Sequence, residues 1–171
     1  MPVELVLLSA AHLEGLAELV ADPDVQRFTR IPVPPPAGFA QTWLTTFEQA
    51  RLDGAREGFA IVDSLDSSFL GAAVAPRIDR QTATAELGYV VLPGARGRGV
   101  AVDALGQLAA WTFAELGMLR LELLISVVNE PSKRVAERSG FVREGILRSY
   151  YMKPGLREDM EIWSRLPSDP G

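Results

Sequence analysis

A glycine-rich loop at residues 93–99 is the segment whose residue types point most directly to a chemistry. It follows an apolar run that ends at Leu92, and an amphipathic pattern typical of a helix begins near Val100. The first N–H groups of a helix have no partner within the helix, and the helix dipole adds a partial positive charge there. Glycines allow several such groups to approach one anion. The sequence therefore predicts a phosphate-binding site in this loop.

The order of residues in the loop separates three kinds of phosphate site. A P-loop ends in Gly-Lys-Ser or Gly-Lys-Thr, and neither tripeptide occurs in the chain. A dinucleotide fingerprint that starts at Gly97 requires Gly or Ala where the chain has Val102, and it normally lies in the first strand–helix unit of a domain. Residues 96–101 instead read Arg-Gly-Arg-Gly-Val-Ala, which has the form R-x-x-G-x-A. Of the three kinds of phosphate-binding loop, only this third one agrees with the sequence.

The composition excludes several classes of chemistry. The chain contains no cysteine, which rules out disulfides, zinc sites built on thiolates and cysteine nucleophiles. Its one histidine, His12, argues against a histidine-based metal site and against a Ser-His-Asp triad. We therefore expect no bound metal.

Length and charge indicate a single domain with a sizeable core. The 171 residues are 47% hydrophobic and 23% charged. The net charge of −5 disfavours a nucleic-acid partner and would suit a cationic one. The sequence has no apolar run near the roughly 18 residues that span a bilayer and no secretion signal at its start. We expect no membrane partner and a cytoplasmic location.

The R-x-x-G-x-A loop is similar to the pyrophosphate signature of the GNAT acyltransferases. Other segments extend this resemblance to the RimJ/RimL-like branch of that family. Asn129-Glu130-Pro131-Ser132 and residues 134–141 resemble its N-x-x-S and V-A-E-x-x-G-F motifs. Residues 19–25 resemble its L-L-x-D-P-x-V motif, and residues 144–148 with Asp159 match its closing hairpin. Together these segments extend over most of the chain.

The resemblance implies acetyl-CoA, or another acyl-CoA, as the co-substrate. The residues whose backbone amides it assigns to the pyrophosphate are Arg96, Gly97, Arg98, Gly99, Val100 and Ala101. Val91 is expected to pair with the pantetheine arm through its backbone and to place an N–H near the thioester carbonyl. The Asn129 side chain is expected to hydrogen-bond the amides of that arm, although asparagine is also common in turns.

The resemblance also assigns two side chains to catalysis. Glu86 lies on the strand that leads into the loop, where many GNAT enzymes have a general base; the alternative is a solvent-facing charge on an alternating strand. Ser132 matches a serine that hydrogen-bonds or protonates the leaving thiolate; the alternative is a serine that satisfies free amides in the first turn of its helix. Ala136 stands where many other members have a tyrosine acid, which increases the importance of Ser132.

Two further pairs of residues have both a functional and a structural interpretation. Arg134 and Arg138 lie four residues apart on one helical face. They could contact the 3′-phosphate of CoA, but ion pairs with the neighbouring glutamates Glu130 and Glu137 are favoured. Trp43 and Phe47 either line the acceptor side of the site or belong to the core.

The elements that position these residues alternate between strands and helices. The pattern predicts a mixed α/β fold, and the resemblance implies a mostly antiparallel central sheet, flanked by helices and splayed at the acyl-CoA site. The strands are expected at residues 3–8, 59–63, 69–76, 82–92, 119–128, 141–152 and 158–166. The helices are expected after Ser9, at residues 39–52 and 100–116, and from Pro131 to Gly140. Residues 1–167 form one domain in this interpretation, with a short tail at residues 168–171.

The resulting hypothesis is an N-acyltransferase that moves acetyl from acetyl-CoA to a primary amine by direct attack, through a tetrahedral intermediate. No covalent enzyme intermediate is expected, since no cysteine is present. The acceptor is a protein N-terminus or a small-molecule amine, and analogy with the family suggests a homodimer. The alternative is a non-catalytic acyl-CoA-binding or sensor module with the same fold.

Overall fold

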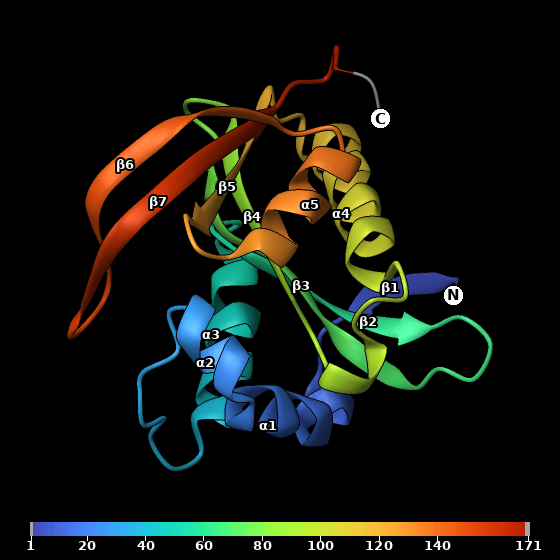
Figure 1. Cartoon of the computed structure of the whole chain (residues 1–171). Coiled ribbons are helices and arrows are strands. Elements are labelled where there is room, and N and C mark those ends of the chain that lie inside the picture. The colour runs from blue at the N-terminus through green and yellow to red at the C-terminus, as the bar shows by residue number, and fades with distance from the viewer. Residues whose placement is uncertain (1, 170–171) are drawn as a thin grey trace.

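The computed structural model describes residues 2–169, which form a seven-stranded sheet with helices on both faces (Figure 1). The strands lie side by side in the order β1-β2-β3-β4-β5-β7-β6. In chain order they span Val3–Leu7, Glu57–Asp63, Phe69–Asp79, Thr84–Val91, Arg120–Ser126, Val142–Lys153 and Leu156–Arg165. Helices α1 to α5 span Leu13–Ala21, Pro23–Phe28, Phe39–Leu52, Val100–Leu116 and Glu130–Arg138. Residues 170 and 171 of the predicted tail lie outside the described part.

The helices cover the two faces of the sheet, with α1, α2 and α3 on one side and α4 and α5 on the other (Figure 1). Successive side chains of a strand point to opposite faces, so each strand contributes to both layers. Leu105 of α4 is fully buried in a cluster that includes Leu87 of β4. Leu44 of α3 is buried in a second cluster, with Ala72 of β3. The sheet thus separates two apolar cores.

The sheet opens between β4 and β5. These two strands run parallel and pair only where Thr84 to Glu86 meet Arg120 to Glu122. Beyond that point β4 remains paired with β3 as far as Val91, and β5 remains paired with β7 as far as Ser126. Each strand therefore keeps one partner and leaves its other edge free. The predicted splay is confirmed.

Helix α4 begins and ends where the sequence predicts. Its buried positions recur at helical spacing, and they include Ala104, Leu105 and Leu108. Gly117 follows the helix with φ 65°, a left-handed conformation that glycine adopts without a steric cost. The N-terminus of α4 is therefore held at the end of the loop that leaves β4.

Helix α2 is an element that the sequence pattern did not predict. No helix was expected between the one after Ser9 and the one at residues 39–52, but Pro23–Phe28 forms a helix of 6 residues. Pro23 takes the first helical position, and Asp22 Oδ1 accepts a hydrogen bond from the Val25 N–H at 2.9 Å. So short a helix shows no burial period, and the capping residues were its only trace in the sequence.

Strands β6 and β7 form a long hairpin that projects from the body on the side away from α4 (Figure 1). Lys153, the last residue of β6, ties this hairpin to the body. Its Nζ donates hydrogen bonds to the backbone oxygens of Gln26 and, at 2.7 Å, of Ile31. Burial, together with the nearby charge of Arg27, lowers the pKa of Lys153. The hairpin is thus fixed against α2 and the loop that follows it.

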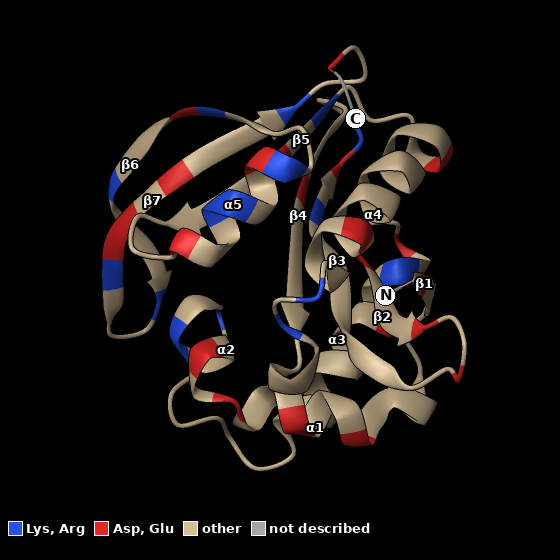
Figure 2. Cartoon of the chain, turned by 45° about the vertical axis from the view of Figure 1, so that its right-hand side comes forward, with Lys and Arg blue, Asp and Glu red and all other residues tan. Residues whose placement is uncertain are grey.

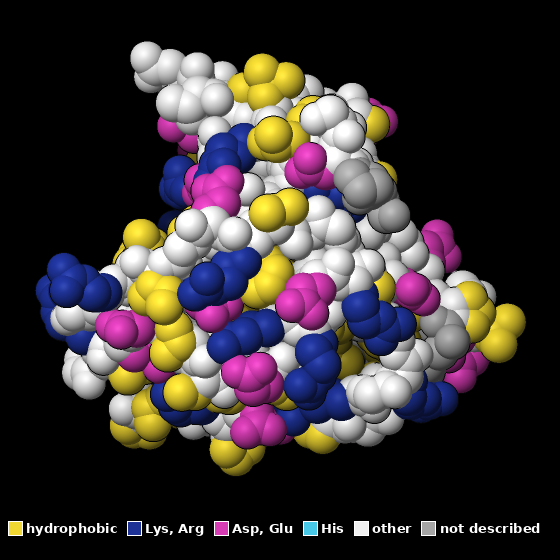
Figure 3. Space-filling view, turned by 45° about the horizontal axis from the view of Figure 1, so that its top comes forward, with side chains coloured by type: hydrophobic (Ala, Val, Ile, Leu, Met, Phe, Trp, Pro, Cys, Tyr) yellow, Lys and Arg dark blue, Asp and Glu magenta, His cyan; other side chains and the backbone are white. Residues whose placement is uncertain are grey.

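Figure 3 shows charged and hydrophobic side chains intermixed on one face of the molecule. Several of the exposed hydrophobic side chains lie on the edge strand β6, including Val142, Ile146 and Tyr151. Within residues 2–169, no helix combines the length and the apolar character needed to cross a membrane.

Candidate active site

One continuous cleft of about 790 Å³ passes through the opening between β4 and β5. It is bordered by α2, α3, the start of α4, the end of β5 and α5. Every residue that the sequence assigned to the site lines this cleft except Arg98, which lies in the loop between Gly97 and Gly99. The structure therefore brings together residues from Glu86 to Ser132.

The loop before α4 offers a run of free backbone amides. Gly97 and Gly99 have φ 72° and 85°, and a Cβ placed on either would meet no atom within 4 Å. The Arg96 N–H already donates to the Pro93 oxygen at 3.3 Å, and the Val102 N–H donates to the Gly99 oxygen at 3.0 Å. In the described part of the chain, the N–H groups at residues 97–101 have no backbone partner. Gly99 is the N-cap of α4 and has no side chain to cap it, so this positive helix end is open.

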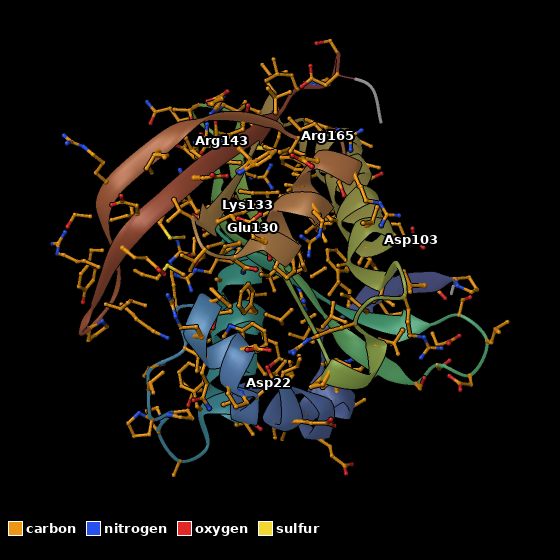
Figure 4. The ribbon with its side chains drawn as sticks, viewed as in Figure 1. Asp22, Asp103, Glu130, Lys133, Arg143 and Arg165 are labelled. Carbon is orange, nitrogen blue, oxygen red and sulfur yellow. The ribbon has the colours of Figure 1, made fainter. Side chains whose placement is uncertain are left out.

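The side chain of Arg96 anchors this loop to the opposite layer of the molecule. Its guanidinium contacts Asp22 at 2.7 Å and Asp24 at 3.0 Å, and its Nε donates to the Val91 oxygen at 3.0 Å. Burial alone would raise the pKa of Asp22, but hydrogen bonds from Arg96 and from the Val25 N–H hold it below its ordinary value. Asp22 lies at the junction of α1 and α2 (Figure 4). Arg96 thus holds the loop in place with its side chain.

Glu86 lies on the face of β4 that α1 to α3 cover. It is 7% exposed, so the alternative of a solvent-facing charge does not hold. Arg30 Nη1 lies 2.7 Å from Glu86 Oε1, and Arg77 Nε lies 3.9 Å from Oε2. Glu86 is thus a buried carboxylate that lines the cleft and that two arginines hold in position.

Ser132 and Asn129 lie at the start of α5, on the other side of the opening. Asn129 is the N-cap, and its Oδ1 accepts a hydrogen bond from the Ser132 N–H at 3.3 Å. The capping role considered for Ser132 therefore belongs to Asn129. Among the described residues, the Ser132 hydroxyl and the Asn129 Nδ2 form no hydrogen bond, and both residues line the cleft.

A tyrosine hydroxyl from β4 lies beside Ser132. Burial raises the pKa of Tyr89 to about 12, and the Ser132 hydroxyl offsets part of that rise. The Tyr89 hydroxyl is buried, and no hydrogen-bond partner for it lies within residues 2–169. The Tyr89 hydroxyl is therefore a neutral group beside Ser132 that can donate a hydrogen bond into the site.

The basic residues of α5 do not pair as expected. Lys133, and neither Arg134 nor Arg138, forms the ion pair with Glu130, at 2.8 Å, and it also lies 3.4 Å from Glu161. Figure 4 shows Glu130 and Lys133 close together on α5. The expected pairs of Arg134 and Arg138 with glutamates are wrong for the described chain, and both arginines line the cleft. Figure 2 shows basic residues on α5, on α2 and in the loop before α4.

Comparison with known proteins decides the family. A model of the acetyltransferase (GNAT) domain matches residues 3–142 of the chain. The chain belongs to the GNAT acetyltransferase family. This acetyltransferase is 26% identical over 151 residues to an uncharacterized N-acetyltransferase of Bacillus licheniformis, a match that covers 88% of this chain and 85% of that protein.

Solved structures share the fold of this GNAT acetyltransferase. RimL, a ribosomal-protein α-N-acetyltransferase in complex with coenzyme A, matches with a TM-score of 0.86 at 19% identity, over 96% of this chain and 93% of that one. The spermidine N-acetyltransferase from Vibrio cholerae, in complex with CoA and spermine, matches with a TM-score of 0.84 at 20% identity, over 97% and 96% of the two chains. The predicted fold, family and enzyme class are confirmed.

Sequence reasoning missed two side chains at the site of this acetyltransferase. Tyr89 alternates with buried apolar residues along β4, so its pattern is that of a core residue. Arg30 lies in the segment after α2, which showed no motif. The signal for Tyr89 was a hydroxyl at a position otherwise suited to an apolar side chain. No signal for Arg30 existed, because its role depends on a partner 56 residues away.

Proposed function

We propose that this acetyltransferase transfers acetyl from acetyl-CoA to a primary amine by direct attack of the amine on the thioester. One observation carries the proposal. The free amides at residues 97–101 open into the same cleft as Glu86 and Ser132. An anion site, a buried carboxylate and a hydroxyl donor along one cleft are the groups that this reaction requires.

The anionic end of acyl-CoA fits the start of α4. Free amides and the helix dipole favour a diphosphate there, and the bare glycines leave room for close approach. Arg134 and Arg138 add positive charge to the lining of the cleft. Their guanidinium groups suit the 3′-phosphate.

The pantetheine arm would occupy the free edge of β4. The Leu92 N–H donates to the Leu70 oxygen at 2.8 Å, so the N–H of the preceding residue, Val91, points away from β3 and into the opening. An extended amide chain pairs with such an edge as an added strand does. The Asn129 Nδ2 faces the same arm from α5 in this proposal.

The amine reaches the thioester from the Glu86 side. A lysine amine has a pKa of about 10.4 and an α-amine about 7.7–8.0, so most acceptors must lose a proton before they attack. Glu86 accepts that proton, either directly or through one water molecule. Arg30, at 2.7 Å, and Arg77, at 3.9 Å, hold the Glu86 carboxylate in place beside the cleft.

The thiolate leaves on the Ser132 side. The nitrogen–carbon bond forms and the carbon–sulfur bond breaks. The attacking nitrogen then loses its second proton, which passes to the sulfur through the Ser132 hydroxyl, so that Ser132 gives one proton and regains one. Alternatively, the thiolate leaves with hydrogen bonds from Ser132 and Tyr89, and that proton goes to water. Tyr89 supports this role because its hydroxyl is neutral and unpaired. It supplies a donor from β4, whereas Ala136 of α5 is 0% exposed and offers none.

The acceptor is a protein N-terminus or a small-molecule amine. RimL is named as a ribosomal-protein α-N-acetyltransferase, and the Vibrio cholerae neighbour as a spermidine N-acetyltransferase. Both are primary amines, and we propose that class for this chain. We also propose a cytoplasmic location, where acetyl-CoA is available.

The test is the release of free CoA from acetyl-CoA with a panel of peptides and amines. Ser132→Ala and Tyr89→Phe should each slow turnover about 10- to 100-fold, and the Kd for CoA should stay within about twofold. Ser139→Ala is the matched control, since Ser139 is a buried serine of the same region that lies outside the cleft. It should keep the wild-type rate. CoA binding without CoA release, whichever amine is supplied, would favour a non-catalytic acyl-CoA-binding module instead.

A further inference from the structure

The acceptor half of the cleft lies on the face of the sheet opposite α4. Val90 of β4 packs against the cluster beneath α1 and α3, whereas its neighbour Val91 packs against the cluster beneath α4. Glu86 is four residues before Val90 on the same strand, so its side chain lies on the same face, the one that α1 and α3 cover. An amine that approaches Glu86 must therefore enter between β4 and the segment from α2 to α3.

Aromatic side chains make up much of this half. Trp43 and Phe47 of α3 form an edge-to-face pair with ring centroids 5.5 Å apart. Phe28 and Phe39, which bound the loop between α2 and α3, line the same cleft, as does Met152 at the tip of β6. Such a wall gains free energy by removing apolar surface of a ligand from water.

The charges of the cleft oppose a polycationic acceptor. The carboxylates in its described lining are Glu86 and Asp24, and an arginine engages each of them: Arg30 at 2.7 Å and Arg96 at 3.0 Å. The basic residues of the lining are Arg30, Arg56, Arg96, Arg134 and Arg138. A polyamine carries further ammonium groups, and each would need a carboxylate of its own. No unpaired carboxylate is left for them within the described lining.

From this arrangement we propose that the acceptor is a primary amine attached to a large apolar or aromatic group. The inference rests on the proposed function, because it names the acceptor of the same site. Two sources share this chemistry: a peptide whose first residue is large and apolar, and a free arylalkyl amine. The amino group lies at Glu86 and the apolar group lies against Trp43 and Phe47. Arg30 and Arg56 repel a second ammonium group.

The test is calorimetric binding of amines to the protein saturated with CoA, which requires no turnover. The probes are a tetrapeptide that starts with Phe, the same peptide starting with Lys, phenylethylamine and spermidine. The Phe peptide or phenylethylamine should bind at least about tenfold more tightly than spermidine and the Lys peptide. Comparison of the two apolar probes distinguishes the sources. Equal or tighter binding of spermidine, or no binding of either apolar probe, overturns the proposal.

Variants of Trp43 test whether the aromatic side chains of the cleft bind the apolar group of the amine. Trp43→Ala should weaken the preferred apolar amine about tenfold, and Trp43→Phe, which keeps a ring, should recover most of that loss. Unchanged CoA affinity in the same preparations shows that the variants are folded. Full amine affinity in Trp43→Ala contradicts the proposal. Amine binding without CoA release from acetyl-CoA leaves this inference intact and removes the proposed catalytic function alone.

Discussion

At the scale of single residues, Glu86 depends on a partner that lies 56 positions earlier in the chain. The alternation of β4 places this carboxylate on the face opposite Leu87, and the sequence alone leaves open whether water or protein covers that face. Arg30 settles it, because its guanidinium lies 2.7 Å from Glu86. Glu86 is therefore a buried, paired carboxylate beside the cleft, and its role as the proton acceptor is the proposal that mutation must test.

Glu86→Gln should lower kcat by about 100-fold, because the amide has the same shape but cannot take the proton of the amine. The Kd for CoA should stay within about twofold of the wild-type value, since Glu86 lies on the acceptor side. Steady-state kinetics and calorimetry measure the two quantities. Glu122→Gln is the matched control. Glu122 lies on β5, the strand beside β4, and its carboxylate also contacts Arg77, at 3.0 Å, but it does not line the cleft. A Glu86→Gln enzyme with wild-type kcat would remove Glu86 from the mechanism.

At the scale of elements, two of the sequence motifs that carry the family resemblance contact each other. Arg96 begins the R-x-x-G-x-A run, and Asp22 and Asp24 belong to the segment at residues 19–25. These partners lie 74 and 72 positions apart in the chain. Each motif is visible in the sequence, but the ion pairs between them are not. The pairs arise because the loop after β4 lies against the start of α2.

Loss of the Arg96 ion pairs with Asp22 and Asp24 should weaken CoA binding, although the Arg96 guanidinium itself is not proposed to contact CoA. Arg96→Gln and Asp22→Asn should each raise the Kd for CoA about tenfold, because the loop amides are then less well preorganised. The double variant should cost little more than either single one, since both remove the same contact. Calorimetric CoA binding to the wild type, the two single variants and the double variant completes this double-mutant cycle. Additive losses would show that the two side chains act independently.

The base of the β6–β7 hairpin gives a test by pH. Arg120 contacts the Glu144 carboxylate at 2.8 Å through both of its terminal nitrogens, and Ser164 donates a third hydrogen bond. These contacts lower the pKa of Glu144 from 4.5 to about 2. A carboxylate whose pKa is lower in the folded state than in the unfolded state stabilises the fold at any pH above its unfolded-state pKa. That stabilisation is lost as the pH falls towards 2.

Glu144→Gln should therefore reduce the free energy of unfolding by about 1 kcal/mol at pH 6, a value kept small by the partial exposure of the pair. The difference between wild type and variant should shrink between pH 4.5 and pH 2. Urea unfolding at pH 6 and at pH 3 measures it. Glu137→Gln, an exposed glutamate of α5, serves as the control. A difference that stays constant with pH would show that Glu144 is not ionised in this pair.

At the scale of the whole molecule, the order of strands and helices could be predicted because each element carries its own signal. Examples are the burial period of α4 and the glycine that ends it at Gly117. A splay of the sheet was expected from the family resemblance, but its place between β4 and β5 was not, because no residue pattern encodes where two parallel strands part. The aromatic wall and its arginines come from segments distant in sequence, so their meeting could not be predicted.

Net charge describes the whole chain and not the cleft. The chain carries −5 overall, which suits a cationic partner. Its acidic side chains, however, lie largely outside the cleft, where arginines outnumber carboxylates. The charge of the cleft therefore differs in sign from the net charge of the chain.

The most direct test of the central claim, that the loop before α4 holds the diphosphate of CoA, is calorimetric CoA binding to Gly99→Glu and Gly99→Ala. Gly99 has φ 85°, so both substitutions strain the backbone alike, and only the first adds a carboxylate in the open space beside the free amides. Gly99→Ala should retain CoA binding within about tenfold of wild type, and Gly99→Glu should lose at least about 100-fold more. Equal CoA affinities for the two variants would contradict that claim.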